Sequence, residues 1–131
     1  MKKKEGFSLV ELLIVLIILG LLGSLVAPKL FSKVSSSKTK TALAQMQMLE
    51  TAIDTYRLDM GNVPSNLELL VRSAAAGWDG PYLPKDVPLD PWGNPYNYIV
   101  PGEDGRPFKL FSYGLDGQVG GEGENEDVVL R

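Results

Sequence analysis

Residues 6–28 read GFSLVELLIVLIILGLLGSLVAP, an apolar stretch in which Glu11 is the only charged residue. At about 1.5 Å per residue, a helix of this length reaches roughly 31 Å, close to the thickness of the hydrocarbon core of a bilayer. Three consecutive lysines precede the stretch, and the positive-inside rule places them in the cytoplasm. We therefore expect one membrane span over 7–28, with residues 29–131 on its far side.

A removable secretory signal has a similar start and is the alternative to a permanent span. Its cleavage site needs small residues, whereas this chain has Leu25 at the first of those positions and Pro28 directly after Ala27. We therefore expect the apolar helix to stay on the chain.

The composition excludes several classes of site. The chain of 131 residues contains no cysteine and no histidine, which removes disulfides, thiolate or histidine zinc sites, and catalysis by Ser-His-Asp or Cys-His groups. The formal net charge is -3 and the lysines form no basic surface, so we expect no nucleic-acid partner. The length suits one small domain attached to an apolar stalk.

Glu11 is unusual because a carboxylate at the centre of a bilayer costs on the order of 2.5 to 3.5 kcal/mol, and less near the interface. One interpretation is that its side chain extends to the cytoplasmic headgroups. However, Gly6 followed by Phe7, with a basic leader before them and a glutamate at the fifth position from Phe7, resembles the signature of type IV prepilins and type II secretion pseudopilins. In that family a membrane-embedded prepilin peptidase cuts after the glycine and methylates the new terminal amine.

The resemblance implies that residues 1–6 are a leader peptide and that Gly6 and Phe7 flank the cleavage and methylation site. It also implies an assembly role for Glu11, whose carboxylate would pair with the Phe7 amine of a neighbouring subunit or of its own chain. Leaving one partner of a buried ion pair alone typically costs about 3 to 5 kcal/mol, which would penalise misregistered stacking.

Pro28 ends the densest apolar stretch and has two interpretations. Inside a helix, a proline removes one hydrogen bond and introduces a kink, and pilin-like helices carry a proline at the corresponding place. The alternative is that Pro28 only marks the exit from the membrane. The sequence leaves both open.

Beyond Pro28, apolar residues recur at steps of three or four, the spacing of one helical face. This pattern predicts one long helix over 7–59, whose amphipathic half, 38–60, packs on the head. The polar segment 32–40, SKVSSSKTK, is weakly helical, and we expect a flexible neck there, not a domain boundary. Gly61 suits the end of the helix. The apolar stripe consists of Ala42, Met46, Leu49, Ile53, Tyr56 and Met60.

The remaining head is predicted to contain a short helix, a long loop and two strands. Ser65 and Glu68 have the form of a capping box, which predicts a helix over 66–75. Prolines and glycines are dense between residues 77 and 95 and favour a loop, fixed by the packing of its aromatic side chains or, alternatively, offering a surface that stacks on carbohydrate. Segments 96–100 and 108–113 read as the strands of a hairpin. The aromatic side chains of the loop are Trp78, Tyr82 and Trp92.

The expected fold class is therefore α+β, with one long amino-terminal helix packed on a small antiparallel sheet and followed by an acidic carboxyl-terminal loop. Two further segments, LDPWGNPY at 89–96 and FSYGLDG at 111–117, resemble the G-type major pseudopilin of type II secretion. With the amino-terminal signature, this resemblance covers essentially the whole chain. It implies a type IV pilin-like fold.

The resemblance implies a structural subunit that polymerises through its amino-terminal helix into a short pseudopilus, whose growth drives folded proteins across the outer membrane. The implied location is the bacterial inner membrane, with the head in the periplasm. The implied partners are further copies of the chain, minor pseudopilins, the inner-membrane assembly platform, the prepilin peptidase and, before assembly, the membrane itself.

The acidic carboxyl-terminal loop carries the expected cofactor. Composition alone favours a solvated acidic tail, although the acids and glycines of 116–127 also supply oxygen ligands on a pliable loop, which suits calcium. G-type pseudopilins bind one calcium ion in this loop, and the resemblance therefore implies the same here. The positions that carry over are the side chains of Asp116, Asp127 and Glu126 and the backbone carbonyls of Tyr113 and Glu124.

Three other functions remain as alternatives. The nearest is a type IV pilus subunit for adhesion, motility or DNA uptake, although many such pilins close a loop with a cysteine pair that this chain lacks. A monomeric membrane-tethered binding module would need Glu11 only as an interfacial residue. A glycosidase would need paired carboxylates such as Asp90 and Asp116 beside a substrate cleft, and so small a head offers little room for one. We expect no enzyme.

Overall fold

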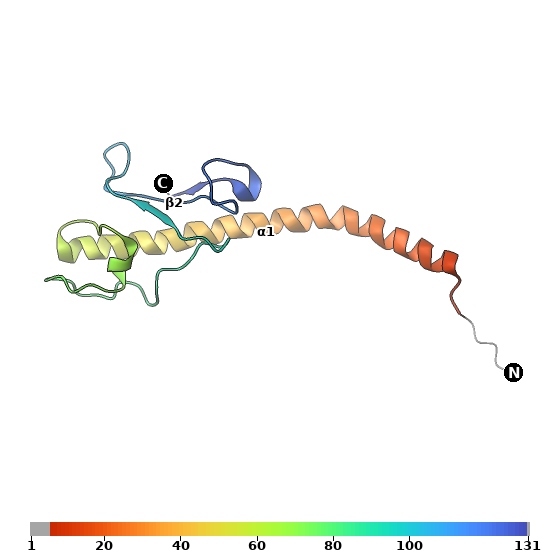
Figure 1. Ribbon diagram of the computed structural model, residues 1–131, viewed down its shortest axis with the longest axis horizontal. Helices are drawn as coiled ribbons and strands as arrows, with labels where there is room; N and C mark the ends of the chain where they lie inside the picture. Colours follow the sequence, from red (N-terminus) through yellow and green to blue (C-terminus); the bar gives the residue numbers. More distant parts are fainter. Residues whose placement is uncertain (1–5, 131) are drawn as a thin grey trace. The chain divides into compact units, whose positions relative to one another are not determined.

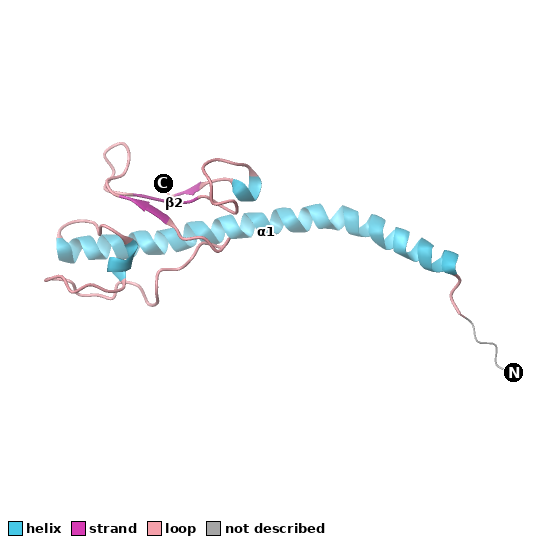
Figure 2. Cartoon of the chain, viewed as in Figure 1, coloured by secondary structure: helices cyan, strands magenta, loops and turns pink. Residues whose placement is uncertain are grey.

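The computed structural model describes residues 6–130, so the leader segment 1–5 and Arg131 lie outside the described residues. The chain divides into two compact units, one up to Val34 and one from Ser35 onward. Figures 1 and 2 show the succession of elements along the chain. These elements are α1 (Leu9–Met60), the 3-10 helix η1 (Leu67–Leu70), β1 (Asn97–Ile99), β2 (Lys109–Ser112), the 3-10 helix η2 (Gly123–Asn125) and β3 (Val128–Val129).

α1 is a continuous helix of 52 residues, close to the predicted range of 7–59. It ends where predicted, because Gly61 adopts φ +84° and its N–H donates to the carbonyl of Arg57 at 2.8 Å. The helix passes through Pro28 and through the polar segment 32–40 without a break. The division between the two units falls inside that polar segment, where the sequence predicted no boundary. A kink at Pro28 and flexibility of the neck stay predictions.

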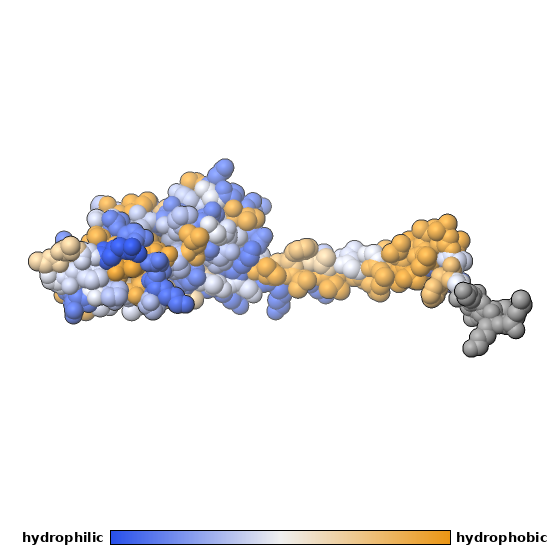
Figure 3. Space-filling view, turned by 60° about the horizontal axis from the view of Figure 1, so that its bottom comes forward, coloured by the Kyte–Doolittle hydropathy of each residue, from blue (hydrophilic) through white to orange (hydrophobic). Residues whose placement is uncertain are grey.

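The first unit exposes its apolar side chains. α1 is long and apolar enough to cross a membrane, and none of its most apolar window is buried within the described chain. This part of the surface is mainly hydrophobic in Figure 3. The core helix of a soluble protein would instead bury such a window against other elements. The apolar stretch therefore needs a partner outside the described residues.

The second unit contains the hydrophobic core. The predicted stripe on α1 is buried from Ala42 to Tyr56, and Met60 is partly buried at its end. The elements that follow α1 supply the other side of this core (Figure 1). Their buried side chains are Leu70, Leu83, Tyr96, Leu110 and Val128.

The sheet has three antiparallel strands in the order β1-β2-β3. Tyr98 of β1 lies opposite Leu110 of β2, and Ser112 of β2 lies opposite Val128 of β3. β1 and β2 fall inside the predicted ranges, whereas β3 was not predicted. The arrangement confirms the expected α+β class, with one long helix packed on a small antiparallel sheet.

The predicted helix over 66–75 is wrong. The structure has only the four-residue η1, capped by Asn66, whose Oδ1 accepts a 3.3 Å hydrogen bond from the N–H of Leu69. Ser65 is therefore not the cap. The carbonyls of Leu69 and Leu70 accept hydrogen bonds from the Trp78 indole and the Tyr82 N–H, each at 2.7 Å. Because the following loop takes these carbonyls, η1 stops instead of extending into an α-helix.

Candidate functional site

The predicted processing site lies immediately before α1. Gly6 and Phe7 are not part of the helix, and Phe7 is 80 % exposed. An ideal Cβ at Gly6 would meet no atom within 4 Å. The bond between the two residues is therefore unobstructed by the described chain, as a peptidase substrate needs. The basic leader of the prediction lies outside the described residues.

Glu11 lies in the first turn of α1. Its N–H donates to the hydroxyl of Ser8 at 3.2 Å, so Ser8 caps the helix and Glu11 is the third helical residue. A carboxylate in this turn is favoured by the helix dipole, typically by about 0.3 to 1 kcal/mol. Glu11 forms no ion pair with any other residue between 6 and 130. Any ionic partner must therefore come from outside the described chain, and the assembly role stays a prediction.

The acidic loop begins at Gly114, which is buried and adopts φ +77°. An ideal Cβ at this position would lie 2.6 Å from the carbonyl oxygen of Glu124 and 2.8 Å from that of Glu126. Next to it, the N–H of Leu115 donates to the Glu124 carbonyl at 2.8 Å. Only glycine allows the two ends of the loop to approach this closely.

The acidic side chains of the loop differ in their burial and in their hydrogen bonds. Asp127 uses Oδ2 to accept from the N–H of Gly120 at 3.0 Å, whereas its Oδ1 is buried and has no hydrogen-bond partner among residues 6–130. Asp116 is exposed and accepts from the N–H of Gln118 at 3.1 Å. The Glu126 side chain is also exposed. Within the described part of the chain, no three acidic side chains gather as a metal-binding group.

The donor set of this loop nevertheless fits calcium. Calcium takes six to eight oxygen ligands, and backbone carbonyls are common among them. The buried Oδ1 of Asp127 has no hydrogen-bond partner in the described part of the chain, and the Glu124 and Glu126 carbonyls meet beside Gly114. The sequence predicted the Glu126 side chain as a ligand. In the structure that side chain is exposed, and it is the Glu126 carbonyl that lies beside Gly114. Tyr113 precedes the loop, and its ring contacts Phe111 edge-on at 4.9 Å between centroids.

A buried hydrogen-bond network supports the start of the loop. Asp90 is 4 % exposed, and its Oδ1 accepts from the N–H groups of Trp92 at 3.0 Å and Asn94 at 2.8 Å. Its Oδ2 accepts from the Ser112 hydroxyl at 2.6 Å. The same hydroxyl accepts from the N–H of Gly114 at 3.1 Å, and the Asn94 side chain donates to the Gly114 carbonyl at 3.1 Å. Sequence reasoning missed this network.

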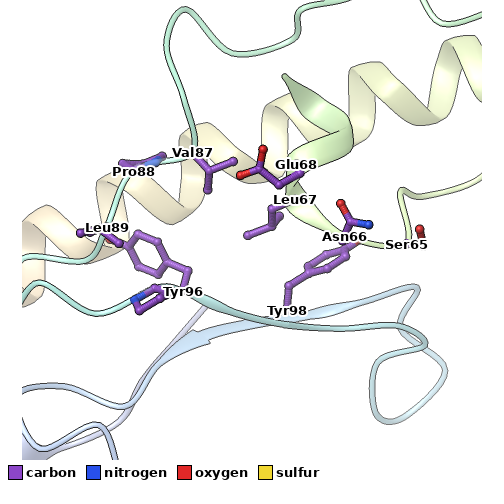
Figure 4. A pocket seen from close by; sticks show the side chains of 10 residues that line it. Ser65, Asn66, Leu67, Glu68, Val87, Pro88, Leu89, Tyr96 and Tyr98 are labelled. Atoms are coloured by element: carbon purple, nitrogen blue, oxygen red, sulfur yellow. The ribbon is translucent and has the colours of Figure 1, made fainter. Parts of the chain in front are cut away.

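The structure gives no support to a glycosidase site at Asp90 or in the groove beside η1. Asp90 is buried and both of its carboxylate oxygens are occupied by hydrogen bonds, so it offers no accessible acid. The groove in Figure 4 has a volume of about 440 Å³ and contains one acid, Glu68. A single carboxylate is not the pair that glycoside hydrolysis uses. The other side chains of the groove are mainly apolar, among them Leu67, Val87, Leu89, Tyr96 and Tyr98.

The loop aromatics pack within the head, as the first interpretation predicted. The Tyr82 ring meets Trp78 and Tyr56 edge-on, with 5.6 Å between centroids in each pair. Trp92 is partly buried against the core. The three side chains are thus packed within the head and partly buried, which disfavours a surface for stacking on carbohydrate.

Comparison with known protein families extends these observations. Residues 29–131 match the family described as "Type II secretion system (T2SS), protein G". Residues 1–27 match the "Prokaryotic N-terminal methylation motif". The chain belongs to the type II secretion system protein G family.

Relatives in this protein G family align over nearly the full length. The type II secretion system core protein G of Pseudomonas aeruginosa is 37 % identical over 135 residues, covering 97 % of this chain and 94 % of the relative. That of Xanthomonas campestris is 40 % identical over 131 residues, covering 98 % and 90 %. A solved structure, the major pseudopilin from the type 2 secretion system of enterohaemorrhagic Escherichia coli, is 28 % identical, with a TM-score of 0.58 over 72 % of this chain and 86 % of that one.

Membership in the protein G family confirms the resemblance drawn from the sequence and the pilin-like fold. The chain is a major pseudopilin, a subunit of the type II secretion pseudopilus. The family is structural, so the chain is not an enzyme. The type IV pilus subunit and the monomeric binding module are correspondingly disfavoured.

Proposed function

We propose that this pseudopilin is held in the inner membrane by the apolar part of α1 and later packs the same surface into the core of a filament. The support is the exposed apolar surface of the first unit, in which Glu11 is the only charged residue from 6 to 28. Before assembly, lipid covers this surface and the head lies in the periplasm. After assembly, neighbouring helices cover it.

Processing prepares the chain for assembly. A prepilin peptidase cuts between Gly6 and Phe7 and methylates the new amine, which then lies one turn from Glu11. In the filament, the Glu11 carboxylate pairs with the Phe7 amine of a neighbouring subunit. Breaking such a buried pair on one side costs about 3 to 5 kcal/mol, so the pair would select one register of stacking.

Growth of the filament then drives folded proteins through a channel in the outer membrane. The chain supplies the repeating structure of the filament, and a cytoplasmic ATPase supplies the energy. Its partners are other copies of the chain, minor pseudopilins and the inner-membrane assembly platform. Pro28 allows α1 to bend as the subunit leaves the membrane.

We also propose that the acidic loop holds one calcium ion. The carbonyls of Glu124 and Glu126 meet beside Gly114, and Asp127 follows them with a buried Oδ1 that no hydrogen bond from the described residues occupies. Asp116, the Glu126 carboxylate and the Tyr113 carbonyl complete the set implied by the family. The ion would neutralise the repulsion among the acids of the loop and make the surface of the head rigid.

Replacing Glu11 in the host tests the assembly mechanism. We expect Glu11→Ala to be processed and inserted in the membrane but to yield few sheared filaments and little secretion. Leu12→Ala is the matched control, because it shortens the neighbouring exposed side chain and removes no charge. Normal filament yield from Glu11→Ala would refute the pairing.

Deleting the gene in its host tests the cellular role. We expect exported enzymes to accumulate in the periplasm while surface motility and DNA uptake stay normal. Normal secretion combined with lost motility or lost DNA uptake would instead identify a pilus subunit. Comparing proteins in the medium and the periplasm of the same strain separates the two outcomes.

A further inference from the structure

The network beneath the acidic loop converges on one residue. The N–H of Gly114 donates to the Ser112 hydroxyl, and the carbonyl of Gly114 accepts from the Asn94 side chain. Asp90 holds both of these groups, because Oδ2 binds the Ser112 hydroxyl and Oδ1 binds the Asn94 N–H. The N–H of Asp90 also donates to the carbonyl of Asn94 at 2.8 Å. A single carboxylate therefore organises both backbone contacts of Gly114.

Gly114 in turn determines how closely the far end of the loop, at Glu124 and Glu126, approaches its start. Its two peptide groups are fixed by the network, and its α-carbon faces the carbonyls of Glu124 and Glu126. These carbonyls precede Asp127, whose buried Oδ1 accepts no hydrogen bond from the residues that the structure describes. The positions of the two carbonyls therefore depend on how Gly114 is held, and Asp127 directly follows the second of them.

The Asp90 carboxylate is buried and therefore needs hydrogen-bond donors from the protein. A carboxylate removed from water costs several kcal/mol unless hydrogen bonds compensate for the lost hydration. Asp90 obtains three donors, two of them backbone N–H groups of its own turn. The third donor, Ser112, is fully buried and lies on β2, 22 positions further along the chain. This last contact links the turn after Asp90 to the acidic loop.

We propose that Asp90 is a positioning residue for the calcium loop. Through Ser112 and Asn94 it fixes Gly114, and it thereby holds the carbonyls of Glu124 and Glu126 and the Asp127 carboxylate ready for the ion. Asp90 itself does not touch the metal. This inference rests on the proposed calcium site. Residues that orient metal ligands in this way typically change metal affinity about 10-fold to 100-fold when they are replaced.

The experiment measures calcium binding to the full chain in detergent micelles by titration calorimetry. Ser112→Ala removes the serine link between Asp90 and the Gly114 N–H, and leaves the Asp90 turn and the Asn94 link in place. Asp90→Asn keeps the shape of the side chain and removes its charge. Asp86→Asn is the matched control, because Asp86 is exposed and pairs with Arg72 at 2.8 Å. We expect the calcium Kd to rise about tenfold or more in the first two variants and to stay unchanged in the control.

A second measurement separates positioning from general stability. The melting temperature of the head is followed by the fluorescence of its two tryptophans, with calcium and with a chelator. A merely structural role would lower both melting temperatures equally, whereas positioning predicts that the rise caused by calcium becomes smaller. In the chelator, we also expect faster amide hydrogen exchange at Gly114 and Leu115 in both variants, with exchange in β1 unchanged.

The outcomes distinguish this inference from the proposed calcium site. If wild type binds calcium and both variants bind it equally tightly, Asp90 has no positioning role. If wild type binds no calcium, the proposed site and the inference fail together. Should Asp90→Asn not fold, Ser112→Ala decides alone, since it removes only one buried hydroxyl.

Discussion

The hydroxyl of Tyr82 joins the proline-rich loop to the end of the long helix by donating a 2.7 Å hydrogen bond to Oδ2 of Asp59. The same hydroxyl accepts from the N–H of Asp79 at 3.0 Å. Partial burial and then the hydrogen bond to Asp59 raise the pKa of Tyr82, so the phenol stays protonated as the donor. Residues 23 positions apart are thus held together by one polar group.

Replacing Tyr82 with phenylalanine should weaken the head. The change keeps the ring contacts with Tyr56 and Trp78 and removes only the two hydrogen bonds, so we expect a lower free energy of unfolding. Urea unfolding of the full chain in detergent micelles, followed by tryptophan fluorescence, measures this free energy. Tyr113→Phe is the control, because the Tyr113 hydroxyl makes no hydrogen bond within residues 6–130. Equal stability of Tyr82→Phe and wild type would contradict this prediction.

The core face of α1 can be tested with two leucines from the same helix. Leu49 is fully buried, whereas Leu58 is 85 % exposed. Leu49→Ala should lower the free energy of unfolding by about 2 to 5 kcal/mol, because it removes buried methyl groups and leaves a cavity. Leu58→Ala makes the identical chemical change and should stay within about 0.5 kcal/mol of wild type. A similar loss in both variants would place Leu58 in a contact that the described chain does not contain.

The sequence predicted the long helix and its buried face well because both follow from local periodicity. Ala42, Met46 and Leu49 repeat at helical spacing, and each is buried. β1 and β2 were also found, since each is a short run of β-formers beside turn residues. β3 was missed because its two residues, Val128–Val129, give too short a pattern without the β2 partner. Its pairing is visible only in three dimensions.

Part of the candidate site was likewise predictable from the local sequence, and part was not. Gly6, Phe7 and Glu11 form a continuous motif, so the sequence was enough to select them, and the family match supports the processing motif. The Asp90 network joins residues 22 positions apart through a serine with no distinctive pattern. An aspartate followed by turn residues signals a local turn. Nothing in that local pattern indicates that Ser112 completes the network.

Alkaline pH should destabilise the head through Tyr96, which is buried, and Tyr98, which is partly buried. The Tyr98 hydroxyl donates to the carbonyl of Pro64 at 2.7 Å, and burial, followed by the nearby Tyr56, raises the pKa of Tyr98 from about 10 to about 12. Burial, followed by the charge of Asp90, raises the pKa of Tyr96 as well. The folded state therefore holds these protons more tightly than the unfolded state. The contribution of Tyr98 to stability is complete below pH 10 and is lost as the pH rises through about 12.

Urea unfolding between pH 8 and pH 12 measures this dependence. We expect Tyr98→Phe to be less stable than wild type by about 1 kcal/mol at pH 8, because the Pro64 carbonyl loses its donor. We also expect its stability to fall less steeply above pH 10, since one phenol whose pKa is raised by folding is gone. If the curves of wild type and Tyr98→Phe stayed parallel to pH 12, the pKa of Tyr98 would not be raised by folding.

Two glycines have nearly the same backbone conformation but different surroundings. Replacing each with alanine therefore distinguishes the cost of local backbone strain from the cost of opening the acidic loop. Gly105 has φ +75° and an ideal Cβ there meets nothing within 4 Å, whereas Gly114 has φ +77° and faces the carbonyls of Glu124 and Glu126. Gly105→Ala should cost about 1 to 2 kcal/mol, the penalty of a left-handed conformation. Gly114→Ala carries the same penalty and must also push two backbone carbonyls away, which adds about 1 to 3 kcal/mol.

The same pair of variants should differ in calcium binding. Moving the carbonyls of Glu124 and Glu126 displaces oxygens of the proposed shell, so Gly114→Ala should bind calcium at least about tenfold more weakly. Gly105→Ala leaves the loop untouched and should bind it as wild type does. Equal unfolding free energies for the two variants would show that the loop yields to a methyl group. Equal calcium Kd values would show that the ion does not depend on the conformation at Gly114.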